Sequence, residues 1–370
     1  MQVIDADSHV EEPAEAWEDL DPRFEQRKPF AITGENRADL FGVNSFWYVD
    51  GRVFPHPVGR GATFYATPVT MERATRKPFS LASQTLTEPA ARVRDLDEAG
   101  VAAQVIYPSV FLEPLTEDAA FEAALMHSYN SYMAAQCGQH PERLKWAGLV
   151  PLRAIEEGVA EVQRAQALGA SALAVMTCTI GERLLDDPAL DPIWAKAERA
   201  GIPLCIHCGW SHPGITNAFD TSYGAHVLGF TLPVLMAFFA FTGGGILDRF
   251  PRLKLGFLEA GCEWVPYLVQ RMDHYFNSEA GKGRRLPERR ASEYLRENAI
   301  YFTTEAEEQH LAQVLEFVGE DRIMISVDMP HGEAREGTIA EIEERADLSA
   351  VQKRKLLVDN AARFYGIAMS

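Results

Sequence analysis

The sequence predicts a single α/β domain spanning residues 1–370, a (β/α)8 barrel (TIM barrel) with an insertion after its first strand. Short, uniformly apolar runs that suit buried parallel strands alternate eight times with helical segments. Polar residues follow several of these runs, and barrels carry their chemistry at the carboxyl ends of strands. A doubly wound open sheet is the rival, but it would show a glycine-rich loop after its first strand, and residues 7–11 contain no glycine.

The first strand, expected at 3–9, carries an unusual row of polar residues. Side chains alternate along a strand, so Asp5, Asp7 and His9 are expected on one face, with Ser8 on the other. Burying two carboxylates and an imidazole together costs several kcal/mol unless something compensates. A divalent cation would compensate, which predicts a metal site. The alternative is a polar strand end solvated in a loop.

Residues 14–91 are irregular, with many aromatics, prolines and glycines and no sustained period. A hairpin is expected at 45–54, because Asp50-Gly51 separates two short apolar runs. A segment of this length without regular structure is usually functional, so we expect an insertion that caps the active site. Four basic residues in it are candidate partners for a substrate anion, with solvated surface charge as the alternative: Arg60, Arg73, Arg76 and Lys77.

From residue 92 the pattern is regular, and several helices end in a glycine, a common helix terminator. The further strands are expected at 101–107, 145–150, 172–176, 202–207, 253–258, 299–303 and 322–327. The helices between them are expected at 89–99, 117–140, 155–168, 192–200, 227–242, 264–276 and 308–318, and two more helices close the chain.

Composition and charge narrow the class of protein. Hydrophobic residues make up 47% and charged residues 24%, as in ordinary globular proteins. The formal charge of -18 argues against nucleic acid or an anionic membrane as a partner and fits a cytoplasmic protein that handles small molecules. No signal peptide is visible, and the apolar run 227–241 is expected to be too short to span a membrane and interrupted by Pro233. The apolar surface of a helix at 231–241 would suit a homodimer.

Five chemistry-bearing residues stand at the ends of the expected strands. They are Asp7 and His9 after strand one, His207 after strand five, Glu259 after strand six and Asp328 after strand eight. In a barrel these positions converge on one mouth. Two imidazoles with two or three carboxylates form a mixed nitrogen and oxygen site, suited to Zn2+ or Mn2+. For His207 taken alone, a hydrogen-bonded core histidine is the alternative.

Four segments together resemble a known family. They are DADSH at 5–9, PLCIH at 203–207, LDRFPRLKL at 247–255 and SVDMPH at 326–331. The chain resembles the amidohydrolase superfamily, in the amidohydrolase-2 branch that includes α-amino-β-carboxymuconate-ε-semialdehyde decarboxylase and γ-resorcylate decarboxylase. The resemblance covers nearly the whole chain.

The resemblance implies one divalent ion held by Asp7, His9, His207 and Asp328, with Zn2+ as the first expectation and Mn2+ as the second. Asp328 would also shuttle protons. Two positions depart from the family: Asp7 replaces the commoner His or Glu, and Glu259 stands where the decarboxylases carry a catalytic histidine. Glu259 could transfer protons or become a further ligand.

Three residues are candidates for contact with substrate. They are Trp210 after strand five, His226 at the start of the apolar helix and His331 after strand eight. For His226 and His331 a structural hydrogen bond is the alternative.

These residues are compatible with three functions. The first is a metal-dependent, non-oxidative decarboxylase of an aromatic or unsaturated carboxylic acid, with Asp328, Glu259 and His207 as catalytic residues. The second is a hydrolase of an amide, lactone or C–C bond, with metal-bound water as nucleophile and Asp328 as base. The third is a barrel that binds a ligand without turnover. The branch resemblance favours the decarboxylase, whereas Glu259 favours the hydrolase.

Overall fold

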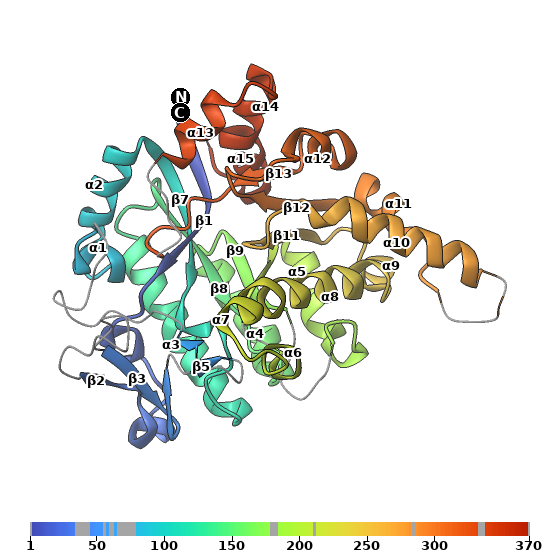
Figure 1. Cartoon of the computed structure of the whole chain (residues 1–370). Helices are drawn as coiled ribbons and strands as arrows, with labels where there is room; N and C mark the ends of the chain where they lie inside the picture. The colour runs from blue at the N-terminus through green and yellow to red at the C-terminus, as the bar shows by residue number, and fades with distance from the viewer. Residues whose placement is uncertain are drawn as a thin grey trace.

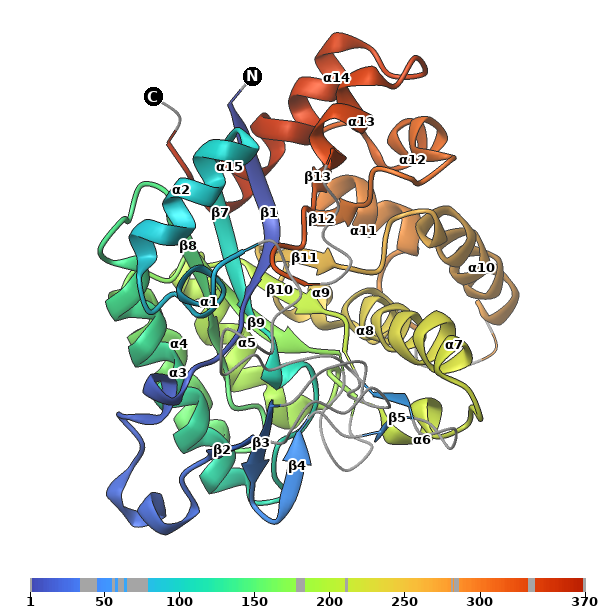
Figure 2. The same ribbon diagram turned by 60° about the vertical axis from the view of Figure 1, so that its left-hand side comes forward.

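The computed structural model describes residues 2–33, 45–54, 57–58, 63–64, 79–177, 184–209, 212–280, 282, 286–331 and 337–368. Eight parallel strands lie side by side in sequence order and form a nearly closed barrel with helices around it (Figure 1, Figure 2). The strands are β1 (Val3–Val10), β7 (Val101–Pro108), β8 (Leu144–Leu149), β9 (Ala172–Met176), β10 (Leu204–His207), β11 (Lys254–Leu258), β12 (Ala299–Thr304) and β13 (Ile323–Ile325). The predicted fold class is confirmed.

Helices follow the strands in the predicted order. They are α2 (Pro89–Ala99), α3 (Ala119–Cys137), α4 (Ile155–Ala167), α5 (Asp191–Ala200), α8 (Thr231–Thr242), α10 (Trp264–Glu279) and α12 (Leu311–Val318). After β13 come α13 (Thr338–Glu344) and one continuous stretch made of α14 (Ala350–Arg354), a π-helical turn (Lys355–Asp359) and α15 (Asn360–Tyr365). The helices α2 and α5 end at Gly100 and Gly201, whose φ angles of 71° and 67° lie in the left-handed region that glycine adopts without strain.

Backbone hydrogen bonds connect β1 to the segment after β13, across the gap between the first and the last strand. The amide of His9 donates to the carbonyl of Met329 at 2.7 Å, and the amide of Asp328 donates to the carbonyl of Asp7 at 3.0 Å. We call this contact the β1–β13 seam. It joins residues from the two ends of the sequence; three of these four residues are predicted site residues, and the fourth, Met329, directly follows one of them.

The first strand departs from strict alternation. All of β1 is buried, and its pairing with β7 shifts register between Asp5 and Ser8. The irregularity turns the Ser8 hydroxyl toward Asp5, to whose carboxylate it donates. The expectation that Ser8 faces away from Asp5 is therefore wrong, because an irregular ladder does not keep the two-residue period.

The apolar helical segment extends further than its sequence suggested. It covers Val227–Arg249, 23 residues that would be long and apolar enough to cross a membrane by length and composition alone. Within it, α8 ends at Thr242 and a short helix, α9 (Ile246–Arg249), begins after Gly245, whose φ angle is 77°. Pro233 does not interrupt it: a π-helical turn, Ala225–Phe230, passes directly into α8, and Pro233 is the third residue of α8. Of the apolar window 56% is buried inside the protein, so this helix is only weak evidence for a membrane span. The cytoplasmic location stays a prediction.

Part of the insertion is described, and its predicted hairpin is confirmed. The strands β3 (Ser45–Val49) and β4 (Arg52–Phe54) pair antiparallel across Asp50-Gly51, whose φ angles are 50° and 84°. With β2 (Phe30–Thr33) they form a small sheet at the end of the molecule toward which β1 runs (Figure 2). The hydroxyl of Thr116, ahead of α3, donates to Asp50 at 2.5 Å and ties the hairpin to the barrel. The capping role stays a prediction, and Arg60, Arg73, Arg76 and Lys77 lie outside the described residues.

Candidate metal centre

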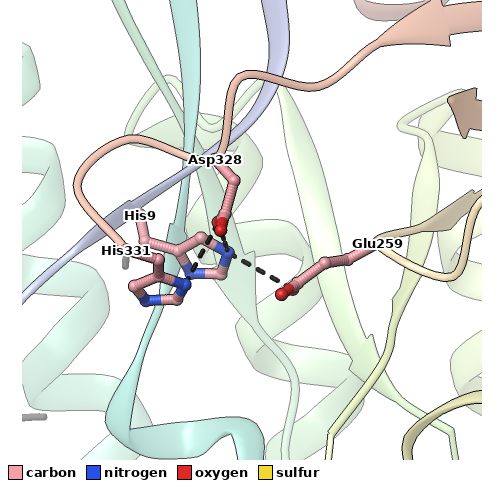
Figure 3. A group of neighbouring side chains, drawn as sticks. All are labelled: His9, Glu259, Asp328 and His331. Atoms are coloured by element: carbon pink, nitrogen blue, oxygen red, sulfur yellow. Dashed lines mark ion pairs between the residues drawn. The ribbon is translucent and has the colours of Figure 1, made fainter. Parts of the chain in front are cut away.

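The structure brings together the five residues predicted at the barrel mouth. His9 Nε2 lies 3.5 Å from Asp328 Oδ1 and 3.6 Å from Glu259 Oε2 (Figure 3). His207 Nε2 lies 3.3 Å from Asp7 Oδ1 and 3.0 Å from Glu259 Oε2. Two imidazoles and three carboxylates thus share one small volume, although they come from four different strand ends.

Backbone carbonyls fix how the two imidazoles face this volume. His9 Nδ1 lies 2.8 Å from the carbonyl of Pro108, and His207 Nδ1 lies 2.9 Å from the carbonyl of Cys208. A carbonyl oxygen only accepts hydrogen bonds, so each Nδ1 carries a proton. In the neutral imidazole, Nε2 then offers a lone pair toward the carboxylates. This is how proteins commonly prepare metal-ligating histidines.

The Asp7 carboxylate supplies the clearest test of whether a metal fits. Asp7 is fully buried, and neither of its oxygens accepts a hydrogen bond from the described part of the chain. An isolated buried carboxylate would cost several kcal/mol. Burial lowers the pKa of His207, but the nearby negative charges, that of Asp7 first, outweigh burial and raise that pKa. The carboxylates therefore attract a cation to Nε2, and a divalent ion among these donors satisfies both groups.

The two carboxylates that end β11 and β13 sit on strained backbone. Glu259 and Asp328 have φ angles of 55° and 56°, a left-handed conformation that costs a residue with a Cβ about 1–2 kcal/mol. The amide of Glu259 donates to Thr303 Oγ1 at 2.9 Å, and the amide of Asp328 donates to the backbone carbonyl of Asp7 at 3.0 Å. These two hydrogen bonds help to hold the strained turns in place. The turns point both carboxylates at His9 (Figure 3). Such strain is typical of functional sites.

His331 lies beside the cluster and connects Asp328 to the end of β7. Its ring stacks on His9 with centroids 3.9 Å apart. Its Nδ1 lies 3.1 Å from Asp328 Oδ1, and its Nε2 lies 2.8 Å from Ser109 Oγ. Ser109 was missed in the sequence, although it directly follows Pro108 at a strand end, which is the signal that identified the other candidates.

The two remaining candidates cannot be placed. Trp210 and the side chain of His226 lie outside the described residues, although the backbone of His226 belongs to a π-helical turn, Ala225–Phe230. Their roles stay predictions. A small apolar recess adjoins His207 at the ends of β7 to β10; it is lined by Phe111, Leu112, Leu149, Val175, Met176 and Cys208, among others.

Comparisons with known proteins identify relatives of this chain. The 2-amino-3-carboxymuconate-6-semialdehyde decarboxylase of Dictyostelium discoideum is 25% identical over 285 residues, covering 76% of this chain and 77% of that protein. The structure of an amidohydrolase from Mycobacterium avium subsp. paratuberculosis K-10 superposes with a TM-score of 0.80 at 23% identity, over 99% of both chains.

A third relative shows a ligand in this type of barrel. It is 5-carboxyvanillate decarboxylase from Novosphingobium aromaticivorans, in complex with manganese and 4-hydroxy-3-methoxy-5-nitrobenzoic acid, with a TM-score of 0.69 at 24% identity, over 81% of this chain and 85% of that one. That protein carries manganese, so zinc as the metal of this chain stays a prediction.

A sequence model of the amidohydrolase family matches residues 4–367, nearly the whole chain. The resemblance inferred from the four segments is therefore confirmed, and the chain belongs to the amidohydrolase family of enzymes.

Proposed function

We propose that this enzyme is a divalent-metal-dependent, non-oxidative decarboxylase of an aromatic or unsaturated carboxylic acid. The observation that carries the proposal is the convergence of His9 and His207, each presenting Nε2, with Asp7, Glu259 and Asp328. The relatives described above, two of them decarboxylases of unsaturated or aromatic acids, support it.

Asp7, His9, His207 and Asp328 would hold the metal, with Glu259 close enough to become a further ligand. A divalent metal held by these residues would supply Lewis-acid stabilisation of the negative charge that develops during decarboxylation. Mixed imidazole and carboxylate donors suit both Mn2+ and Zn2+. We place Mn2+ first on the precedent of the carboxyvanillate enzyme, which reverses the order expected from the sequence.

The side chains of this chain would move the proton. In decarboxylation the bond between the carboxylate carbon and the neighbouring carbon breaks, its electron pair stays on that neighbouring carbon, and CO2 leaves. A proton from Glu259 or Asp328 then completes the C–H bond. His331, 3.1 Å from Asp328 Oδ1, would keep that carboxylate oriented during the transfer. The apolar recess beside His207 would hold part of the substrate skeleton away from water.

A substrate panel tests the proposal directly. Purified enzyme would be stripped with a chelator, reloaded with Mn2+ or Zn2+, and assayed with hydroxybenzoates, aminomuconate-like acids, lactones and amides. We expect CO2 release from at least one carboxylic acid, dependent on the metal. Acid release from a lactone or amide without any CO2 would replace this function by hydrolysis, and equal activity of the stripped enzyme would contradict metal dependence.

Hydrolysis is the second candidate, and one observation favours it. Glu259 Oε2 lies 3.0 Å from His207 Nε2, so a third carboxylate stands beside the proposed ligands, where the decarboxylases that the sequence resembles carry a histidine. A carboxylate there is suited to take a proton from an attacking water. The same panel separates the two functions, because only decarboxylation liberates CO2.

Ser109→Ala is expected to lower kcat about tenfold with little change in KM or metal content. The substitution removes the hydroxyl 2.8 Å from His331 Nε2, so His331 is free to reorient and Asp328 is held less well. Ser128→Ala is the matched control, because Ser128 is equally buried but donates to the carbonyl of Ala16, away from the cluster. Equal kcat for wild type and Ser109→Ala would contradict the role of this contact.

A further inference from the structure

Arg92 is a fully buried arginine outside the cluster of ligands. Arg92 lies on α2, and Arg94, two residues further along the same helix, is exposed. Burying a guanidinium is expensive, and burial lowers the pKa of Arg92 to about 10, so the group stays charged at neutral pH. The described contacts of its guanidinium are all with backbone carbonyls and one side-chain amide oxygen. A buried guanidinium that donates mainly to backbone carbonyls holds the backbone segments that carry those carbonyls in fixed positions.

The backbone that Arg92 contacts is that of the β1–β13 seam. Nη2 donates to the carbonyl of His9 at 2.9 Å, and Nη1 lies 3.5 Å from the carbonyl of Met329. These two residues already share the seam hydrogen bond from the His9 amide to the Met329 carbonyl. Nε donates to the carbonyl of Ser83 at 3.0 Å, which anchors the guanidinium to α1 (Leu81–Thr85). One planar group therefore holds the backbone of His9 and of the residue after Asp328.

A second arm reaches the other side of the seam through Gln104. Arg92 Nη1 donates to Gln104 Oε1 at 2.9 Å, and Gln104 Nε2 donates to Asp5 Oδ2 at 2.9 Å. Asp5 Oδ1 in turn accepts the amides of Val327 at 3.0 Å and Asp7 at 3.3 Å. The chain Arg92–Gln104–Asp5 thus bonds to the backbone of Asp7 and to that of the residue before Asp328.

We propose that Arg92 is a positioning residue that sets the separation between the β1 ligands, Asp7 and His9, and Asp328 across the seam, and thereby the affinity for the metal. The inference rests on the metal site of the proposed function. Arg92 forms no hydrogen bond with the side chain of any of these three ligands, but it bonds to the backbone of His9 directly and, through Gln104 and Asp5, to that of Asp7. A lysine ammonium cannot donate in the same plane to carbonyls on two strands and to an amide, so charge alone is not enough.

The test compares Arg92→Lys and Arg92→Met with Arg94→Met as the matched surface control. Each variant, purified as full chain, is titrated with Mn2+ and followed by electron paramagnetic resonance, and its metal-free melting temperature is recorded in chelator. We expect Mn2+ binding at least tenfold weaker in Arg92→Lys and Arg92→Met at a temperature where both are folded, and within twofold of wild type in Arg94→Met.

A purely structural arginine gives a different result. Metal affinity equal to wild type in folded Arg92→Lys, with only a lower melting temperature, would overturn the inference while the proposed function stands. Absence of Mn2+ and Zn2+ binding in the wild type would instead overturn the proposed function. If neither Arg92 variant folds, Gln104→Met decides, because it cuts the link to Asp5 and keeps the guanidinium; an unchanged affinity there would also overturn the inference.

Discussion

His207→Ala is expected to lose bound metal and turnover together. The imidazole presents Nε2 between Asp7 and Glu259, and its removal leaves one fewer nitrogen donor and two carboxylates facing each other across a gap. Removal of a residue that only hydrogen-bonds to a metal ligand typically lowers metal affinity about 10- to 100-fold. Removal of a ligand itself should therefore weaken metal binding by at least about 100-fold. Elemental analysis after gel filtration, together with CO2 release by the same sample, measures both losses.

The control for this substitution is His274→Ala, because His274 lies exposed on α10, away from the barrel mouth. It should keep the metal content and rate of the wild type. A His207→Ala enzyme that retains one equivalent of metal would show that His207 is not a ligand. Its ring would then be held in place by the carbonyl of Cys208 and by the carboxylates of Asp7 and Glu259, without a metal contact.

The eight strands and the residues at the barrel mouth could be predicted from the sequence, because they follow from short apolar runs and from the rule that barrel strands end at a common mouth. Strands such as β9, Ala172–Met176, are short apolar runs. Such a run, preceded by a glycine that ends the helix before it, predicts a strand. The rule that barrel strands end at a common mouth then places His207, Glu259 and Asp328 together, although more than fifty residues separate each from the next. The Asp50-Gly51 hairpin is equally local.

The rest depends on contacts that the sequence does not express. In the sequence, Arg92 is one of two basic residues on the helix that becomes α2, and nothing distinguishes it from Arg94. Only the packing of α2 in the structure shows that Arg92 is buried and Arg94 is exposed. The register shift in β1 that brings Ser8 to Asp5 depends on pairing with β7. The proton positions on His9 depend on where the carbonyl of Pro108 falls, about a hundred residues away.

Glu259→Gln is expected to lower turnover by about two to four orders of magnitude with metal content unchanged, which is the range for loss of a general acid or base. The substitution keeps size and shape but removes the transferable proton. Glu259 Oε2 lies 3.0 Å from His207 Nε2 and 3.6 Å from His9 Nε2, so the carboxyl group reaches the space between the two proposed imidazole ligands. Its strained backbone, with φ at 55°, is retained by glutamine, so folding should be little affected.

Three outcomes assign the residue. A large loss of rate with full metal occupancy makes Glu259 the proton carrier, and solvent-deuterium incorporation into the product should then slow in the same proportion. A parallel loss of metal makes it a fifth ligand. If rate and metal both survive, Asp328 alone must carry the proton, and His331 and Ser109 gain in importance because they are the contacts that orient it. Glu263→Gln, an exposed carboxylate four residues along, is the matched control and should leave both quantities unchanged.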